Sequence, residues 1–99
     1  MRDFILFMHS DAEHEPAGDD WASYFGRLRE AGAFQGGSSI GAGECFRLCG
    51  EPGPLHDRLS GYIRLQATDL EAARELVEGN PVLKAGGTVE LRELPTEDT

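Results

Sequence analysis

The chain has 99 residues, of which 39% are hydrophobic and 27% are charged. These values are typical of one globular domain and exclude disordered, collagen-like and fibrous proteins. Eighteen acidic residues against nine basic ones give a net charge of −9, which argues against nucleic acid or an anionic membrane as a partner, because phosphate contacts need clustered cations. No apolar run approaches the ~18–20 residues of a membrane span, and no signal-peptide cleavage site follows the short apolar start.

The first part of the chain predicts a strand, a loop and a helix. The apolar run 4–8 is typical of a strand that is buried on both faces. The polar stretch 10–20 contains turn-forming residues and predicts a loop. Apolar residues then recur at helical spacing, which predicts a helix over about 20–31 with Asp19 or Asp20 as its cap.

The middle of the chain predicts a hairpin. Residues 34–40 weakly indicate a strand because they contain two glycines. Residues 45–49 indicate a second strand, in which Phe46 and Leu48 alternate with Cys45, Arg47 and Cys49. We expect these two segments to pair with each other.

The last part of the chain predicts a loop followed by a strand, a helix and a final strand. The loop covers 50–59, and the strand 62–65. A capping box at 68–71 starts the helix, which ends at the Gly-Asn-Pro sequence of 79–81. Alternating apolar and charged residues predict the last strand at 88–94.

The predicted element order is β-α-β-β-β-α-β. Without one strand of the middle hairpin it becomes the βαββαβ order of the ferredoxin-like fold, an α+β fold with two helices on one face of an antiparallel sheet. We expect one domain over residues 1–95, followed by an acidic tail at 96–99.

The first strand predicts a homodimer. Phe4, Leu6 and Met8 point to one face of the sheet, and Ile5 and Phe7 point to the other. Two helices cover only one face, so a second copy packed sheet against sheet would cover the other. Symmetric dimers are the commonest oligomers.

Several stretches resemble the YCII-related (DGPF) family. The most specific is the C-terminal block that runs from Asn80-Pro81 through Gly86-Gly87 to Arg92. The other similar stretches are 4–11, 21–32, 53–55, 59–63 and 68–73, so the resemblance covers nearly the whole chain.

This resemblance implies a dimeric α/β barrel with a cleft near the ends of the first strand and the first helix. Some members are lyase-like or isomerase-like enzymes of small, often aromatic or lactone compounds, with a His–Asp pair proposed as catalytic. Others look like accessory partners of transcriptional regulators. The histidine and aspartate of the enzyme-like members fall here at Tyr24 and Asn80, which do not exchange a proton near neutral pH. Together they can still orient a ligand by hydrogen bonds.

Polar residues at the end of the first strand are the candidate catalytic groups. His9 and Asp11 are two residues apart, which places both side chains on one face of an extended chain, so Asp11 would orient His9 as a general base. The alternatives are a metal cluster with Glu13 and His14, or a solvated acidic loop. We predict no metal, because spacing alone does not provide three or four convergent ligands.

Arginine and tyrosine residues of the expected central strands are the candidate binding groups. Tyr62 and Arg64 share one face of their strand, and Arg47 belongs to the predicted hairpin. A covered arginine needs an anion, a carboxylate or water. One interpretation is a pocket for an anionic molecule, and the other is an ion pair in a dimer interface with a glutamate such as Glu90.

The remaining candidates favour structural roles. His56-Asp57 lies in a loop, where charged groups are usually only solvated. Cys45 and Cys49 are interpreted as buried free thiols of a cytoplasmic protein, since strand residues four apart are about 13 Å apart, beyond the reach of a disulfide. No glycine-rich element has phosphate-loop or dinucleotide spacing, so we predict no cofactor.

The sequence therefore predicts a homodimer that binds a small anionic or aromatic molecule in a cleft near His9, Asp11, Tyr24, Arg64 and Asn80. The alternatives are a lyase-like or isomerase-like enzyme in which His9 moves a proton, and a non-catalytic partner of a regulatory protein. An open cleft favours ligand binding, and an interior filled by side chains favours the partner role.

Overall fold

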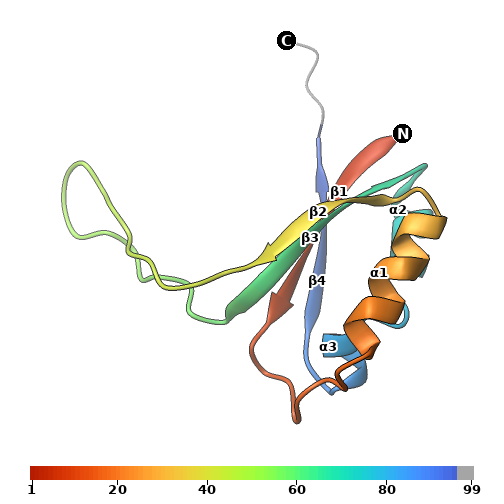
Figure 1. The fold of residues 1–99 in the computed structure, drawn as a ribbon. Helices are drawn as coiled ribbons and strands as arrows, with labels where there is room; N and C mark the ends of the chain where they lie inside the picture. The colour runs from red at the N-terminus through yellow and green to blue at the C-terminus, as the bar shows by residue number, and fades with distance from the viewer. Residues whose placement is uncertain (96–99) are drawn as a thin grey trace.

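A computed structural model describes residues 1–95, which form one antiparallel sheet with helices on one face (Figure 1). Helices and strands follow in the order β1, α1, β2, β3, α2, α3, β4. Their bounds are β1 Arg2–His9, α1 Asp20–Glu30, β2 Phe34–Ser39, β3 Leu59–Ala67, α2 Leu70–Val77, α3 Pro81–Lys84 and β4 Val89–Leu94. The acidic tail predicted at 96–99 lies outside the described residues. No helix within residues 1–95 is long and apolar enough to cross a membrane.

The strand order β2-β3-β1-β4 confirms the predicted ferredoxin-like fold. Neighbouring strands are all antiparallel, and β1 lies between β3 and β4. Ile5 is paired with Arg64 of β3 and with Arg92 of β4, so these three side chains share one face of the sheet. The interleaved order follows from two crossovers, each of which places a helix over the same face.

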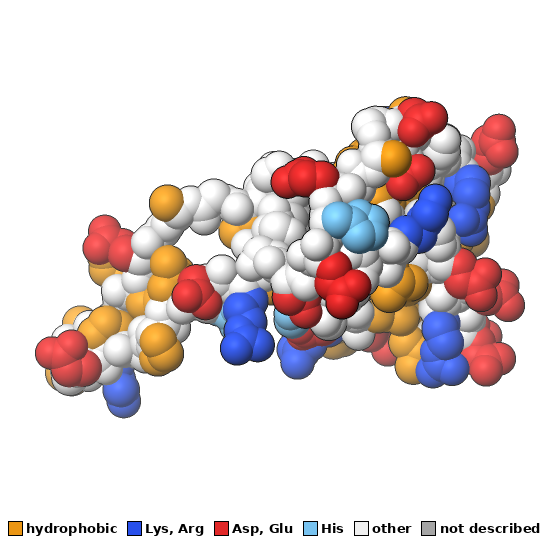
Figure 2. Space-filling model, turned by 90° about the horizontal axis from the view of Figure 1, so that it is seen from below, with side chains coloured by type: hydrophobic (Ala, Val, Ile, Leu, Met, Phe, Trp, Pro, Cys, Tyr) orange, Lys and Arg blue, Asp and Glu red, His pale blue; other side chains and the backbone are white. Residues whose placement is uncertain are grey.

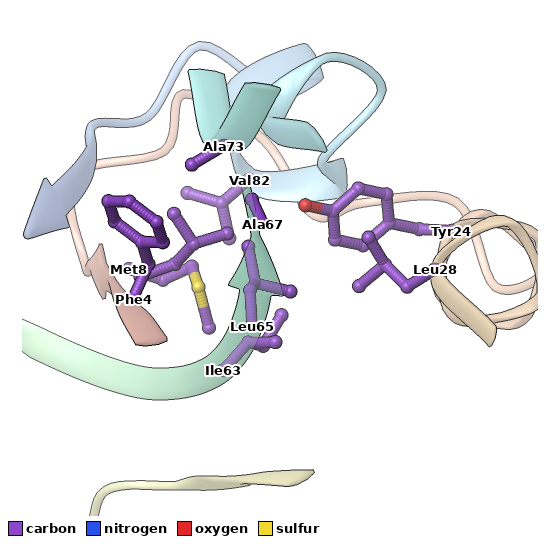
Figure 3. Close-up of a cluster of buried hydrophobic side chains, with 10 residues drawn as sticks. Phe4, Met8, Tyr24, Leu28, Ile63, Leu65, Ala67, Ala73 and Val82 are labelled. Atoms are coloured by element: carbon purple, nitrogen blue, oxygen red, sulfur yellow. The ribbon is translucent and has the colours of Figure 1, made fainter. Parts of the chain in front are cut away.

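The core lies between the sheet and the helices. Phe4 and Leu6 are fully buried and Met8 nearly so, and Tyr24 and Leu28 extend from α1 toward the strands (Figure 3). Burial of each such side chain stabilises the folded state by about 1.5–3 kcal/mol relative to leaving it exposed. The apolar side chains that alternate along β1 and those that recur at helical spacing along α1 thus pack in one apolar layer.

The other face of the sheet carries no element of the described chain. Its side chains on β1 are Asp3, Ile5, Phe7 and His9, all partly exposed. We call this surface the open face; it also carries Tyr62, Arg64, Gln66, Glu90 and Arg92. The prediction that the helices leave one face of the first strand uncovered is therefore correct.

The strand predicted at 45–49 is wrong. Residues 41–58 contain no helix or strand, and β2 pairs with β3 instead. Alternating side chains do not make a strand where no neighbour pairs with the backbone, and six glycines and prolines at positions 41, 43, 50, 52, 53 and 54 interrupt the segment. The thiols are accordingly not buried: Cys45 is partly exposed and Cys49 exposed. The reason given against a disulfide, strand geometry, does not hold.

Smaller differences concern the ends of elements. Strand β3 is longer than predicted because Arg2–His9 and Phe34–Ser39 pair along most of it. The cap of α2 is Asp69, whose side chain accepts a hydrogen bond from the Ala72 N–H. At the start of α1, Asp19 makes no side-chain capping bond. After α2 the chain forms the additional short helix α3, which the proline at 81 allows because it stands in the first turn.

Candidate functional site

A cleft of about 420 Å³ opens between α1 and the ends of β2 and β3. Its walls include Trp21 and Phe25 of α1, whose ring centroids are 5.5 Å apart in a stacked arrangement. The residues that line it are Met8, Trp21, Phe25, Gly37, Ser38, Ser39, Ser60, Gly61, Tyr62, Ile63 and Val82. None of them is charged, so the cleft suits an uncharged, flat molecule with a few hydrogen-bonding groups.

Two strand glycines, Gly37 and Gly61, line the cleft. Gly37 pairs with Ile63 and Gly61 pairs with Ser39, and the pairing places all four on the helix-covered face. A Cβ atom on Gly37 would lie 2.5 Å from the Tyr62 carbonyl oxygen, so glycine is required there. A Cβ atom on Gly61 would lie 3.1 Å from the Ser38 carbonyl oxygen and 3.3 Å from the end of the Met8 side chain, so this position is also tightly packed.

The structure brings two of the predicted binding residues together, Tyr24 and Asn80. Tyr24 is 1% exposed and its hydroxyl donates a 2.6 Å hydrogen bond to the Leu76 carbonyl. Burial raises the pKa of the Tyr24 hydroxyl, and the Asn80 side chain and the charge of Arg27 partly offset that rise. The pair therefore lies in the interior as a neutral group that links α1 to α2.

Asn80 is a structural cap as well as a neighbour of Tyr24. It is fully buried, and its side-chain oxygen accepts hydrogen bonds from the Val82 N–H at 2.9 Å and the Leu83 N–H at 3.4 Å. Its side-chain nitrogen has no hydrogen-bond partner within the usual distance limits among the described residues. Neither Tyr24 nor Asn80 lines the cleft.

His9 lies on the open face and is paired with a glutamate rather than with Asp11. Its Nε2 atom is 3.0 Å from Oε1 of Glu90, and Oε2 of Glu90 is 3.0 Å from Nε of Arg92. His56 stands edge-on to the His9 ring, with centroids 6.1 Å apart. The imidazole thus lies between a carboxylate and a second ring, and a carboxylate partner is one of the groups that can orient a histidine side chain.

Asp11 anchors the loop after β1. Its carboxylate accepts hydrogen bonds from the Thr88 N–H at 2.8 Å and from the Thr88 hydroxyl at 2.6 Å. These bonds lower the pKa of the Asp11 carboxyl, with a smaller contribution from the nearby His9. The prediction that Asp11 orients His9 differs from this geometry, because the chain turns after His9 and directs the carboxylate toward the start of β4.

Of the predicted anion-binding residues, Tyr62 and Arg64 lie on one strand and Arg47 lies elsewhere. Tyr62 and Arg64 share the open face, as predicted, and Arg64 donates to the Gln35 carbonyl at 3.0 Å and borders a second hollow of about 190 Å³. Arg47 is not on a strand, and it donates to the Glu51 carbonyl at 3.1 Å. Glu90 pairs with His9 and Arg92, not with the arginines of the prediction.

The described residues contain no group of three metal-ligating side chains close enough to hold an ion. His14 is exposed and contacts the Glu15 carbonyl, away from His9. Sequence reasoning missed Gly37 and Gly61 as residues that line the cleft. The only indication of them in the sequence is a glycine inside a strand pattern. That signal indicates a close approach or a hollow but does not say which.

Comparison with solved structures found a similar fold. The chain is similar in fold to 5-chloro-2-hydroxyhydroquinone dehydrochlorinase (TftG) from Burkholderia phenoliruptrix AC1100, solved in complex with 2,5-dihydroxybenzoquinone. The two share 16% sequence identity with a TM-score of 0.54, over 96% of this chain and 95% of the other. No protein-family model matches the chain. No curated protein matches it by sequence. The likeness supports the ferredoxin-like fold.

Proposed function

We propose that this chain binds a small, uncharged aromatic or quinone-like molecule in the cleft between α1 and the sheet. The observation that carries the proposal is the cleft itself, which is lined by two stacked aromatic rings of α1 and by glycines and serines of β2 and β3. An open hollow of this kind favours ligand binding over the role of a filled, non-catalytic partner. Its lining favours an aromatic ligand over the anionic one that the sequence also allowed.

Two further considerations support this assignment. The C-terminal block 80–92 resembles the YCII-related family, so we propose membership of that family and one domain over residues 1–95. TftG, which has the same fold, was solved with a dihydroxybenzoquinone. We therefore choose small hydroxyquinones and hydroxybenzenes as the first probes.

Trp21 provides the direct test, because it is the one tryptophan of the chain and lines the cleft. Titration with 2,5-dihydroxybenzoquinone should change Trp21 fluorescence in a saturable way and raise the melting temperature, since a ligand of the native state stabilises it. Calorimetric titration separates binding from absorption of light by the probe.

Substitutions on the two faces of the sheet give a matched control. Ser39 lies opposite Gly61 on the helix-covered face and lines the cleft, whereas Gln66 lies opposite Asp3 on the open face and does not line it. Ser39→Leu should fill the cleft and weaken binding at least about tenfold, whereas Gln66→Leu should leave binding unchanged. Equal binding by both variants, or no saturable binding by a panel of neutral and anionic aromatics, would overturn the proposal.

A second candidate function is acid–base catalysis at His9. It is favoured by the 3.0 Å contact between His9 Nε2 and Glu90, which would orient the imidazole. His9 lies across the sheet from the cleft, so this chemistry needs a substrate on the open face. If His9 is catalytic, His9→Ala abolishes turnover without lowering the melting temperature; turnover unchanged in that variant would exclude the role.

The open face is also the basis of a proposed homodimer. It carries Ile5 and Phe7 beside polar groups, and a second copy packed sheet to sheet would cover them. Such a dimer would be the α/β barrel expected for the family. The two free cysteines agree with a reducing, cytoplasmic setting, which we propose for the protein.

A further inference from the structure

The segment 41–58 between β2 and β3 extends far from the rest of the molecule, and we call it the arm. It continues the β2–β3 pair beyond the end of the sheet and points away from the helices (Figure 1). Among the described residues, no backbone–backbone hydrogen bond involves residues 41–57. The ladder ends at the bond from the Ile40 N–H to the Ser60 carbonyl. Within residues 1–95, therefore, no backbone hydrogen bond ties residues 41–57 to the sheet or the helices.

The arm carries the two most exposed large apolar side chains of the described residues, Leu48 and Phe46. Leu48 is 100% exposed and Phe46 is 84% exposed, and Leu55 is 47% exposed. Figure 2 shows hydrophobic side chains on the surface of the arm, at the left of the view. Single exposed leucines are ordinary, but a projecting segment with several of them marks a contact surface.

Size and surface both exceed the values for a compact monomer. The radius of gyration is 15.1 Å, against about 12.6 Å for a compact domain of this length. The exposed surface is 6937 Å², against about 5,500 Å² for a folded monomer of this mass. The excess of about 1,400 Å² lies in the range of roughly 1,000–2,500 Å² that each subunit buries in an obligate dimer.

We propose that the arm packs against a second copy of this chain and buries Phe46 and Leu48 there. The proposal rests on the proposed homodimer and adds the arm as a main contact between the two copies. The same chain carries both unsatisfied surfaces, the apolar arm and the open face with Ile5 and Phe7. In a two-fold assembly each protomer offers both surfaces to the other, so both are covered at once. An unrelated partner would need to match two separate surfaces.

The base of the arm reaches the open face of its own chain. His56 stands 6.1 Å from the His9 ring, and the Ser10 N–H donates to the Arg58 carbonyl at 2.6 Å. Docking of the arm would thus fix His56 against His9 and Glu90 from the side of the dimer interface. The arm and the open face then form one continuous contact surface.

The test is the association of the intact chain, measured by sedimentation velocity over a concentration series. The double variant Phe46→Ser/Leu48→Ser should raise the dimer dissociation constant at least about a hundredfold, because four apolar side chains leave the interface of a symmetric dimer. Leu70→Ser is the matched control, since Leu70 is 44% exposed on α2 in the helix layer, and it should associate like the wild type.

Hydrogen exchange of the unmodified chain provides a measurement without any variant. Amides of residues 41–57 should exchange slowly at concentrations above the dissociation constant and rapidly after dilution below it. If the wild type dimerises and the arm variant dimerises equally tightly, the proposed role of the arm is wrong, although the homodimer itself is confirmed. A wild-type monomer at all concentrations would overturn both, while the ligand cleft would still be judged by Trp21 fluorescence.

Discussion

The two faces of β1 present the same kind of side chain to different surroundings. On the helix side, Phe4 and Leu6 are 0% exposed. On the open side, Ile5 and Phe7 alternate with them and remain partly exposed. One apolar run therefore stabilises the folded chain with one half of its side chains and leaves the other half available for a partner. An apolar run in a strand therefore predicts that both faces are covered, but it does not say whether a helix of the same chain or a second molecule covers each face.

The two faces also differ in the chemistry that they carry. The covered face has a neutral, glycine-floored cleft, and its buried polar residues, Tyr24 and Asn80, connect helices. The open face carries the ionisable groups His9, Glu90 and Arg92 in one chain of contacts. Binding of an uncharged molecule and proton transfer are thus candidates on opposite sides of one sheet.

Truncation of one residue from each face should show the largest difference. Leu6→Ala should lower the free energy of unfolding by about 2–5 kcal/mol, because it leaves a cavity in the packed core. Ile5→Ala should cost clearly less, since its side chain is already partly in water. Both are measured by denaturant unfolding at concentrations where the chain is monomeric. Equal losses in the free energy of unfolding would show that both faces of β1 are equally buried in the monomer, which would contradict the structure.

Polar substitution on the open face should act on association rather than on folding. The double variant Ile5→Ser/Phe7→Ser should raise the dimer dissociation constant roughly a hundredfold with a modest change in melting temperature. Sedimentation velocity and thermal unfolding measure the two effects separately. A variant that still dimerises like the wild type would place the interface elsewhere.

Removal of one hydroxyl from the covered face tests the buried polar link. Tyr24→Phe should cost about 1–3 kcal/mol, because the Leu76 carbonyl loses its 2.6 Å donor. Burial raises the Tyr24 pKa above 10.0, so the folded state favours the neutral phenol. Its contribution is complete below pH 10 and is lost as pH rises through the folded-state pKa.

The pH dependence distinguishes this hydroxyl from general alkaline unfolding. Denaturant unfolding from pH 8 to 11 should show a steeper loss of stability in the wild type than in Tyr24→Phe. Parallel curves would mean that Tyr24 keeps an ordinary pKa and that other groups cause the loss.

The smallest effect is expected at the edge between the faces, where Asp11 anchors its loop. Thr88 lowers the Asp11 pKa below 3.8 by two hydrogen bonds. The charged carboxylate therefore stabilises the fold above pH 3.8, and this contribution is lost as pH falls through the folded-state pKa. Asp11→Asn should lower the melting temperature by a few degrees at pH 7.

The difference between Asp11→Asn and the wild type should vanish at acidic pH, where Asp11 itself is neutral. Thermal unfolding at a series of pH values measures it. Thr88→Val provides the companion variant, because it removes the hydroxyl and keeps the backbone N–H. A difference that persists unchanged at low pH would exclude the charge as its cause.

Local patterns in the sequence determined most of the fold. The period of two in β1, the helical spacing of 20–30 and the Gly-Asn-Pro end of α2 each act over a few residues. They were sufficient to predict the four strands, the helices α1 and α2 and the uncovered face of β1, although they added a strand at 45–49 and missed α3. The same patterns failed at 45–49, because alternation describes only one strand and says nothing about a neighbour that pairs with it.

Tertiary structure alone decided the site. His9 meets Glu90 across 81 positions of the sequence, and Asp11 meets Thr88 across 77. Such partners depend on strand register, and the cleft depends on which glycines come to lie opposite α1. Side-chain chemistry and local periodicity can be read from the sequence one residue at a time. Strand register, in contrast, depends on the packing of the whole sheet, so only the folded chain shows which groups face one another.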